Sequence, residues 1–137
     1  MEEKVYLELT RDQADTIEEA CELLARLYIG QFRTITEKLF PAFYNDRDSY
    51  YKKRDDVNDA LDLAAKLLFG RTAYGTPDCS KTREHNRAWD IYQTLRYVRS
   101  WHDHPEGDHW SVCFDEPLNC SGEPLPVCRI ETIRETQ

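Results

Sequence analysis

The stretch TREHNRAWDIYQTLRYVRSWHD, residues 82–103, is the most regular part of the sequence and decides the fold class. Its apolar side chains recur at about 100° per residue, the spacing of an α-helix. One face of that helix carries Ala88, Ile91, Leu95, Val98 and His102. We therefore expect a helix over 82–103 that buries this face in the core.

A capping box marks the start of a first helix. Thr10 is placed as the N-cap, and Gln13 three residues on completes the box for a helix that runs to about Ile29. A stripe on this helix is expected in the core and consists of Ile17, Cys21, Leu24 and Tyr28.

Two more helices are expected before residue 82. A short one spans 31–40, and the polar stretch at 45–53 follows neither the helical nor the strand period, so we expect a loop there. The next helix begins at Asp55 or Asp56 and ends at Gly70. The apolar stripe of this helix consists of Val57, Leu61, Ala64 and Leu68. We expect this stripe to pack against the stripe of the first helix.

Both ends of the chain are expected to be extended. Residues 4–10 alternate apolar and polar side chains, as a half-buried strand does, and 127–133 are expected to form a last strand. The tail over 104–137 is expected to pack on the helices. The predicted fold is a single domain over 1–137, mainly α: a compact bundle of three to four helices with a minor β contribution from the N-terminal and C-terminal segments.

Composition excludes several classes of function. The chain has 137 residues and a formal net charge of -8, and a surface of that sign repels DNA and RNA. No apolar run approaches the roughly 20 residues that cross a bilayer, and Met-Glu-Glu-Lys lacks the apolar region of a signal peptide. We expect a protein of the host-cell cytoplasm that binds neither a nucleic acid polymer nor a membrane, carries no cofactor, and keeps its five cysteines reduced.

The other side of the 82–103 helix carries candidate ligand-binding residues: His85, Trp89, Tyr92, Gln93, Arg96 and Arg99. A tryptophan opposite the core needs a covering surface, because an exposed indole leaves a large apolar area in water. Arginine beside an aromatic ring also suits a nucleotide, with guanidinium on phosphate and ring on base. This face therefore packs on the tail, on a second copy of the chain, or on a ligand.

Three further candidates lie elsewhere. Arg26 and Arg33 lie opposite the apolar stripe of the first helix, although Glu22 is four residues before Arg26 and can pair with it as an ordinary ion pair. Tyr74 belongs to the turn-rich connection over 71–80, where binding residues are often found.

Motifs for catalysis are absent from the sequence. It has no Gly-x-Ser-x-Gly, phosphate-binding loop, dinucleotide glycine fingerprint or kinase motif. His102, His104 and His109 are candidate metal ligands, but their spacing matches no common zinc signature. We therefore expect a binding protein rather than an enzyme, and we keep a metal-dependent hydrolase as a third alternative.

Four segments carry a resemblance to a known group of proteins: ACELLAR over 20–26 with Gly30-Gln31-Phe32, AWDIYQ over 88–93 with Arg96, Trp101-His102, and SGEPLP over 121–126. In these segments the chain resembles a family of small, largely uncharacterised proteins of phages and bacterial mobile elements. The cysteine-rich tail departs from that pattern. The resemblance implies a setting and no known activity.

In that setting, small proteins without enzyme motifs commonly counter host defence. We expect a non-enzymatic binding protein that sequesters a small nucleotide-like signal, such as a cyclic nucleotide or an ADP-ribose derivative, in a homo-oligomer. The alternative is a protein–protein interaction module that binds and inhibits a host defence protein.

Overall fold

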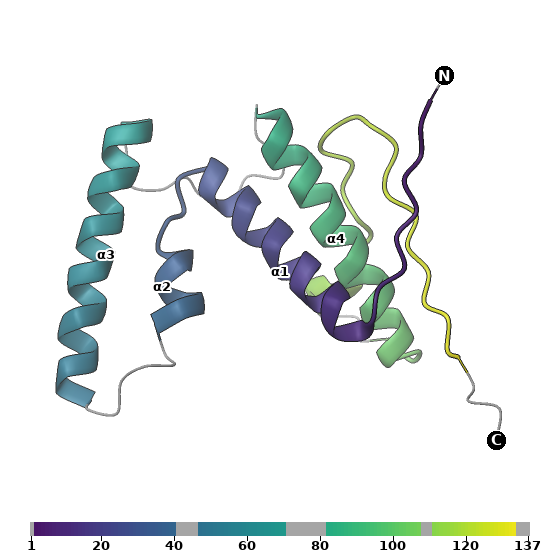
Figure 1. Ribbon diagram of the computed structural model, residues 1–137, viewed down its shortest axis with the longest axis horizontal. Helices are drawn as coiled ribbons and strands as arrows, with labels where there is room; N and C mark the ends of the chain where they lie inside the picture. The colour runs from purple at the N-terminus through teal and green to yellow at the C-terminus, as the bar shows by residue number, and fades with distance from the viewer. Residues whose placement is uncertain (1, 41–46, 71–81, 108–110, 134–137) are drawn as a thin grey trace.

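The computed structural model describes residues 2–40, 47–70, 82–107 and 111–133 (Figure 1). The chain is mainly helical, as predicted, with α1 (Arg11–Tyr28), α2 (Thr34–Leu39), α3 (Arg47–Phe69), α4 (Arg83–Asp103) and the short 3-10 helix η2 (Val112–Phe114). Within the described ranges there is no strand, and no helix is long and apolar enough to span a membrane.

Helices α1 and α4 pack side by side and run in opposite directions. Arg11 at the start of α1 pairs with Asp103 at the end of α4, and Arg26 near the end of α1 lies over Trp89 near the start of α4. Helix α2 packs on both α1 and α3, whereas α3 stands apart from the α1–α4 pair (Figure 1). The molecule is thus a helix pair with an α2–α3 arm beside it.

The helix ends follow the signals in the sequence. The Thr10 hydroxyl accepts a hydrogen bond from the Gln13 backbone N–H at 3.3 Å, and the Gln13 side chain accepts one from the Thr10 N–H at 2.9 Å. This is the predicted capping box. Gly30 follows α1 with φ 81°, and Gly70 follows α3 with φ 76°, a backbone conformation that glycine adopts without strain. Both predicted helix ends are confirmed.

Helix α3 is longer than the sequence predicted. The expected loop over 45–53 is wrong from Arg47 onward, because the helix already begins there. Its first turns are held by aromatic contacts: the Tyr50 ring lies 5.2 Å from that of Phe40, and the Arg54 guanidinium lies 5.0 Å from the Tyr51 ring. A search for an apolar period does not detect such contacts. Helix α2 is also shorter than the predicted helix over 31–40.

The predicted core stripe of α1 lies largely at the surface, and that of α3 is only partly buried. Ile17, Leu24 and Tyr28 of α1 are exposed, and so is Leu68 of α3. The predicted packing of one stripe on the other is wrong, because α3 packs on α2. Helix α1 packs on α4 with the side that carries the buried residues Ala25 and Ile29. This side is rotated about a quarter-turn around the helix axis from the predicted stripe.

The buried side of α4 is more polar than predicted. Ala88 is buried as expected, but His102 is exposed, so its assignment to the core is wrong. His85, Asp90 and Gln93 are buried instead. For Asp90 and Gln93 the burial has a cause outside the helix, since the returning tail lies against them and supplies hydrogen-bond partners.

Side chains of α4 hold the tail by accepting hydrogen bonds from the tail backbone. The Asp90 carboxylate accepts from the N–H of Cys120 at 2.8 Å, from the N–H of Ser121 at 3.1 Å and from the Ser121 hydroxyl at 2.5 Å. The Gln93 side-chain oxygen accepts from the N–H of Leu118 at 3.2 Å. These contacts satisfy backbone donors of the tail without a strand ladder.

The expected β contribution from the two ends is not found in the described residues. Residues 4–10 are exposed and do not form a strand, and residues 127–133 likewise form no β-ladder. An alternating pattern yields a strand only where a neighbouring strand supplies the hydrogen bonds, and the tail docks on α4 through side chains instead.

Replacing Asp90 by alanine should detach the tail and destabilise the fold. Three donors would lose a buried, charged acceptor, so we expect the free energy of unfolding to fall by about 2–4 kcal/mol. Urea unfolding measures the loss, and limited proteolysis should cut the tail faster. Asp115→Ala, an exposed change on the same tail, is the control and should cost less than about 0.5 kcal/mol. Wild-type stability and proteolysis in Asp90→Ala would contradict this attachment.

Candidate functional site

Five of the predicted ligand-binding residues form one continuous row: Arg26, His85, Trp89, Tyr92 and Arg96. The rings of His85 and Trp89 stack with centroids 6.0 Å apart, and those of Trp89 and Tyr92 lie 5.1 Å apart. Arg26 lies 5.8 Å from the Trp89 ring, and Arg96 lies 4.9 Å from the Tyr92 ring. Arginines therefore lie beside aromatic rings here, but the cations on the rings belong to the chain itself.

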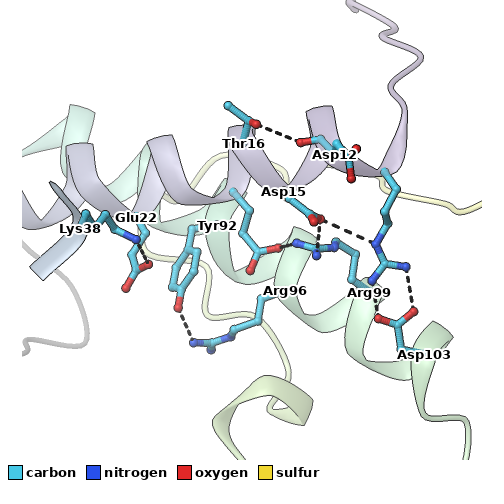
Figure 2. A network of polar contacts seen from close by, with 11 residues as sticks. Asp12, Asp15, Thr16, Glu22, Lys38, Tyr92, Arg96, Arg99 and Asp103 are labelled. Atoms are coloured by element: carbon cyan, nitrogen blue, oxygen red, sulfur yellow. Dashed lines mark hydrogen bonds and ion pairs between the residues drawn. The ribbon is translucent and has the colours of Figure 1, made fainter. Parts of the chain in front are cut away.

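Arg99 lies away from this row and holds α1 to α4. Its guanidinium pairs with Asp15 and Glu18 of α1, and Figure 2 shows it pointing across from α4 to the Asp15 carboxylate. Burial raises the pKa of Glu18, and the positive charge of Arg99 opposes that rise. Both carboxylates compete with any anionic ligand, so Arg99 has a structural role here.

Two more candidates are also engaged inside the fold. His85 is buried, with its Nδ1 2.9 Å from the side-chain oxygen of Asn86. Gln93 holds the tail through Leu118. Tyr74 lies outside the described residues.

Arg26 and Arg33 meet at a pocket between α1, α2 and α3. It has a volume of about 430 Å³ and is lined by Arg26, Gln31, Phe32, Arg33, Thr34, Glu37 and Asp62. Pockets for small molecules and cofactors span roughly 300–1,000 Å³, so this one is large enough for a mononucleotide. Arg26 also belongs to the aromatic row, which places the two features side by side.

Each arginine of the pocket is positioned by partners within the chain. Arg26 donates from Nε to Glu22 at 2.9 Å and from Nη1 to the Gln31 side chain at 2.8 Å. Arg33 donates from Nε and Nη2 to the two carboxylate oxygens of Asp62, at 2.9 and 2.5 Å. This hydrogen-bonded pairing raises the pKa of Arg33 and lowers that of Asp62.

One terminal nitrogen of each guanidinium is left for a ligand. Among the described residues, Arg26 Nη2 and Arg33 Nη1 make no hydrogen bond to the protein. The carboxylates thus fix the two planar groups in place without using all their donors. The pocket can accept phosphate or carboxylate oxygens at two preset positions.

Most of the pocket lining was not predicted. Gln31, Phe32, Thr34 and Glu37 belong to a short segment with no recognisable motif. Asp62 is 29 residues from Arg33 in sequence and reaches it only because α3 packs on α2. A pair at that separation leaves no spacing signal in a single sequence.

The predicted histidine cluster does not assemble a metal site in the part of the chain that the structure describes, where no group of three or more His, Cys, Asp or Glu side chains could hold an ion. His102 is exposed, and His104 lines a second pocket of about 430 Å³ with Asp103 and Glu106. His109 lies outside the described residues. The free thiols include Cys21, Cys113 and Cys128.

Comparisons with family models, with curated proteins and with solved structures found no match for this chain. What the protein binds must therefore be inferred from its own residues.

Removing Arg99 should raise the pKa of Glu18 further. Burial already raises it, and Arg99 is the main opposing charge, so Arg99→Gln leaves a half-buried carboxylate without its cation. A folded-state pKa above the ordinary 4.5 means that the associated stability is complete below 4.5 and is lost as pH rises through the folded pKa. The destabilisation caused by Arg99→Gln should thus be larger at pH 7 than at pH 4, as measured by urea unfolding.

Arg87→Gln is the matched control for this change. Arg87 pairs with Glu123 at 2.6 Å, but both side chains are about half exposed, so its loss should cost little at either pH. A Glu18 pKa that stays unchanged in Arg99→Gln, followed by NMR of the carboxyl carbon, would contradict the assigned role.

Proposed function

We propose that the protein is a non-enzymatic binding protein that takes up a small nucleotide-like anion in the Arg26–Arg33 pocket. The observation that carries this proposal is the meeting of two guanidiniums beside Phe32 at one pocket of about 430 Å³, each with a terminal nitrogen that bonds to none of the described residues. Guanidinium groups bind phosphate oxygens with directional hydrogen bonds, and an aromatic ring can stack on a base.

The acidic residues of the pocket narrow the class of ligand. Glu37 and Asp62 accept hydrogen bonds and repel a bare polyanion. A nucleoside phosphate brings amino and hydroxyl donors for these carboxylates, together with phosphate oxygens for Arg26 and Arg33. Cyclic nucleotides and ADP-ribose derivatives carry both the phosphate oxygens and the amino and hydroxyl donors, whereas inorganic phosphate lacks the donors of a base and a sugar.

Sequestration of such a signal requires affinity and no chemical step. It fits a pocket built from fixed arginines, and it fits the resemblance to small phage proteins that act in the cytoplasm of the host. In that setting the protein lowers the free concentration of a defence signal.

Two variants of the pocket should change ligand affinity in opposite directions. Arg33→Ala removes a charged donor, so we expect the Kd to rise by at least about tenfold. Asp62→Asn keeps a hydrogen-bond acceptor for Arg33 but no longer neutralises it, so the Kd for an anion should fall. Thermal-shift screening with linear nucleotides, cyclic nucleotides and ADP-ribose selects the probe, and calorimetry measures the Kd.

Arg87→Ala is the matched control for Arg33→Ala. Like Arg33, Arg87 is about half exposed and is held by a carboxylate through two of its nitrogens, but it lies outside the pocket. Its variant should bind as the wild type does. Equal losses in both arginine variants, or no stabilisation by any of these nucleotides, would refute the proposal.

A second candidate function is a module that binds a host protein. One observation favours it, namely the exposed leucines of α3: Leu63, Leu67 and Leu68. Whether these leucines are covered by a foreign protein or by another copy of this chain is decided by the measurement below.

A further inference from the structure

The isolated chain exposes more surface than a compact protein of its mass. Its accessible surface is 10806 Å², whereas a folded monomer of 16.2 kDa exposes about 7,500 Å². Part of the excess belongs to the extended ends, where residues 2–10 are exposed throughout. Helix α3, which stands apart from the α1–α4 pair, also adds to the exposed surface (Figure 1).

The second half of the outer side of α3, from Ala60 onward, is apolar and largely exposed. Leu63, Leu67 and Leu68 retain 58%, 78% and 69% of their full exposure. Ala60 and Ala64 lie on the same side of the helix, at the i, i+3, i+4, i+7 and i+8 spacing that usually marks a buried face. We call these five residues the α3 face; it includes no charged side chain.

Helix α1 presents a second face of the same kind. Ile17, Leu24 and Tyr28 retain 36%, 46% and 37% of their full exposure, and Ala20 and Cys21 lie among them. We call these five residues the α1 face. It also lacks charged side chains, because the acidic residues of α1 that pair with Arg99 point to another side.

We propose that two copies of this chain associate by packing the α3 face of each on the α1 face of the other. This inference concerns a surface separate from the pocket and goes beyond the proposed ligand binding.

A second copy is the occupant that the observations favour. The α3 face runs about 12 Å and the α1 face about 16 Å along its helix at 1.5 Å per residue, so the shorter α3 face fits within the length of the α1 face, and both are apolar. A twofold axis lets one pair of chains cover both faces at once and close the assembly. An accessible surface well above that of a compact monomer leaves room for the 1,000–2,500 Å² that each subunit buries in an obligate dimer.

The association would also hold α3, which supplies Asp62 to the pocket. Inside one chain α3 rests mainly on the six-residue helix α2. A partner on its outer side would limit its motion and keep Arg33 in position.

The test is the mass of the full chain in solution by light scattering or analytical ultracentrifugation. The wild type should have twice the 16.2 kDa of the single chain at micromolar concentration. Leu67→Glu and Leu24→Lys, each at an exposed position, should reduce the mass to that of one chain without loss of helical circular dichroism. Val127→Glu, at a residue 97% exposed on the tail, is the control and should leave the dimer intact.

Combining Leu24→Lys with Leu67→Glu identifies the pairing of faces. In the proposed dimer the new lysine and the new glutamate lie on the two faces that meet, so their opposite charges should let the double variant dimerise more strongly than either single variant. A single-chain mass for the wild type would overturn the proposal and leave the leucines to a foreign protein. A dimer that neither single variant weakens, or a double variant that stays monomeric, would overturn the assignment of faces.

Discussion

The pairing of Arg99 with Asp15 and Glu18 is the interaction on which the arrangement of this molecule depends (Figure 2). Among the described residues, the buried hydrophobic side chains are Ala25, Ile29, Ala65 and Ala88, three of them alanines. Larger apolar side chains such as Leu27, Ile91 and Leu95 are only partly buried, so each contributes less than a fully buried one would. The orientation of the α1–α4 contact is set by partly buried ion pairs, which are screened less by solvent than exposed ones.

This ionic contact fixes the rotation of α1 about its axis. With Glu18 and Asp15 turned to Arg99, Arg26 comes to lie over Trp89, and its remaining donors reach Glu22 and Gln31 at the pocket. The same rotation leaves Ile17, Leu24 and Tyr28 at the surface. One set of charges thus positions the candidate ligand site and also exposes the apolar side of the helix.

The sequence was sufficient to locate the helices and insufficient to orient them. Thr10, Gln13 and Gly70 act through bonds and torsions within a few residues, so the ends that they mark could be predicted. The face that a helix buries depends on its neighbours: the Ile17 stripe was expected inside because apolar residues usually are, yet Arg99 draws another side of α1 inward. Arg26 and Arg33 were predicted as binding residues from their chemistry. Asp62 could not be predicted, because it reaches the pocket only through the packing of α3 on α2, and Phe32 could not, because the turn before α2 places it there.

The central claim is that a nucleotide-like anion binds between Arg26 and Arg33. The most direct measurement is an amide NMR titration of the full chain with the nucleotide that best stabilises it. The account predicts that the largest shifts fall on the Arg26, Phe32, Arg33 and Asp62 amides and those between them in the pocket, with small changes in 118–121 of the tail. Shifts concentrated on the tail side of α4, or none at saturating nucleotide, would contradict it.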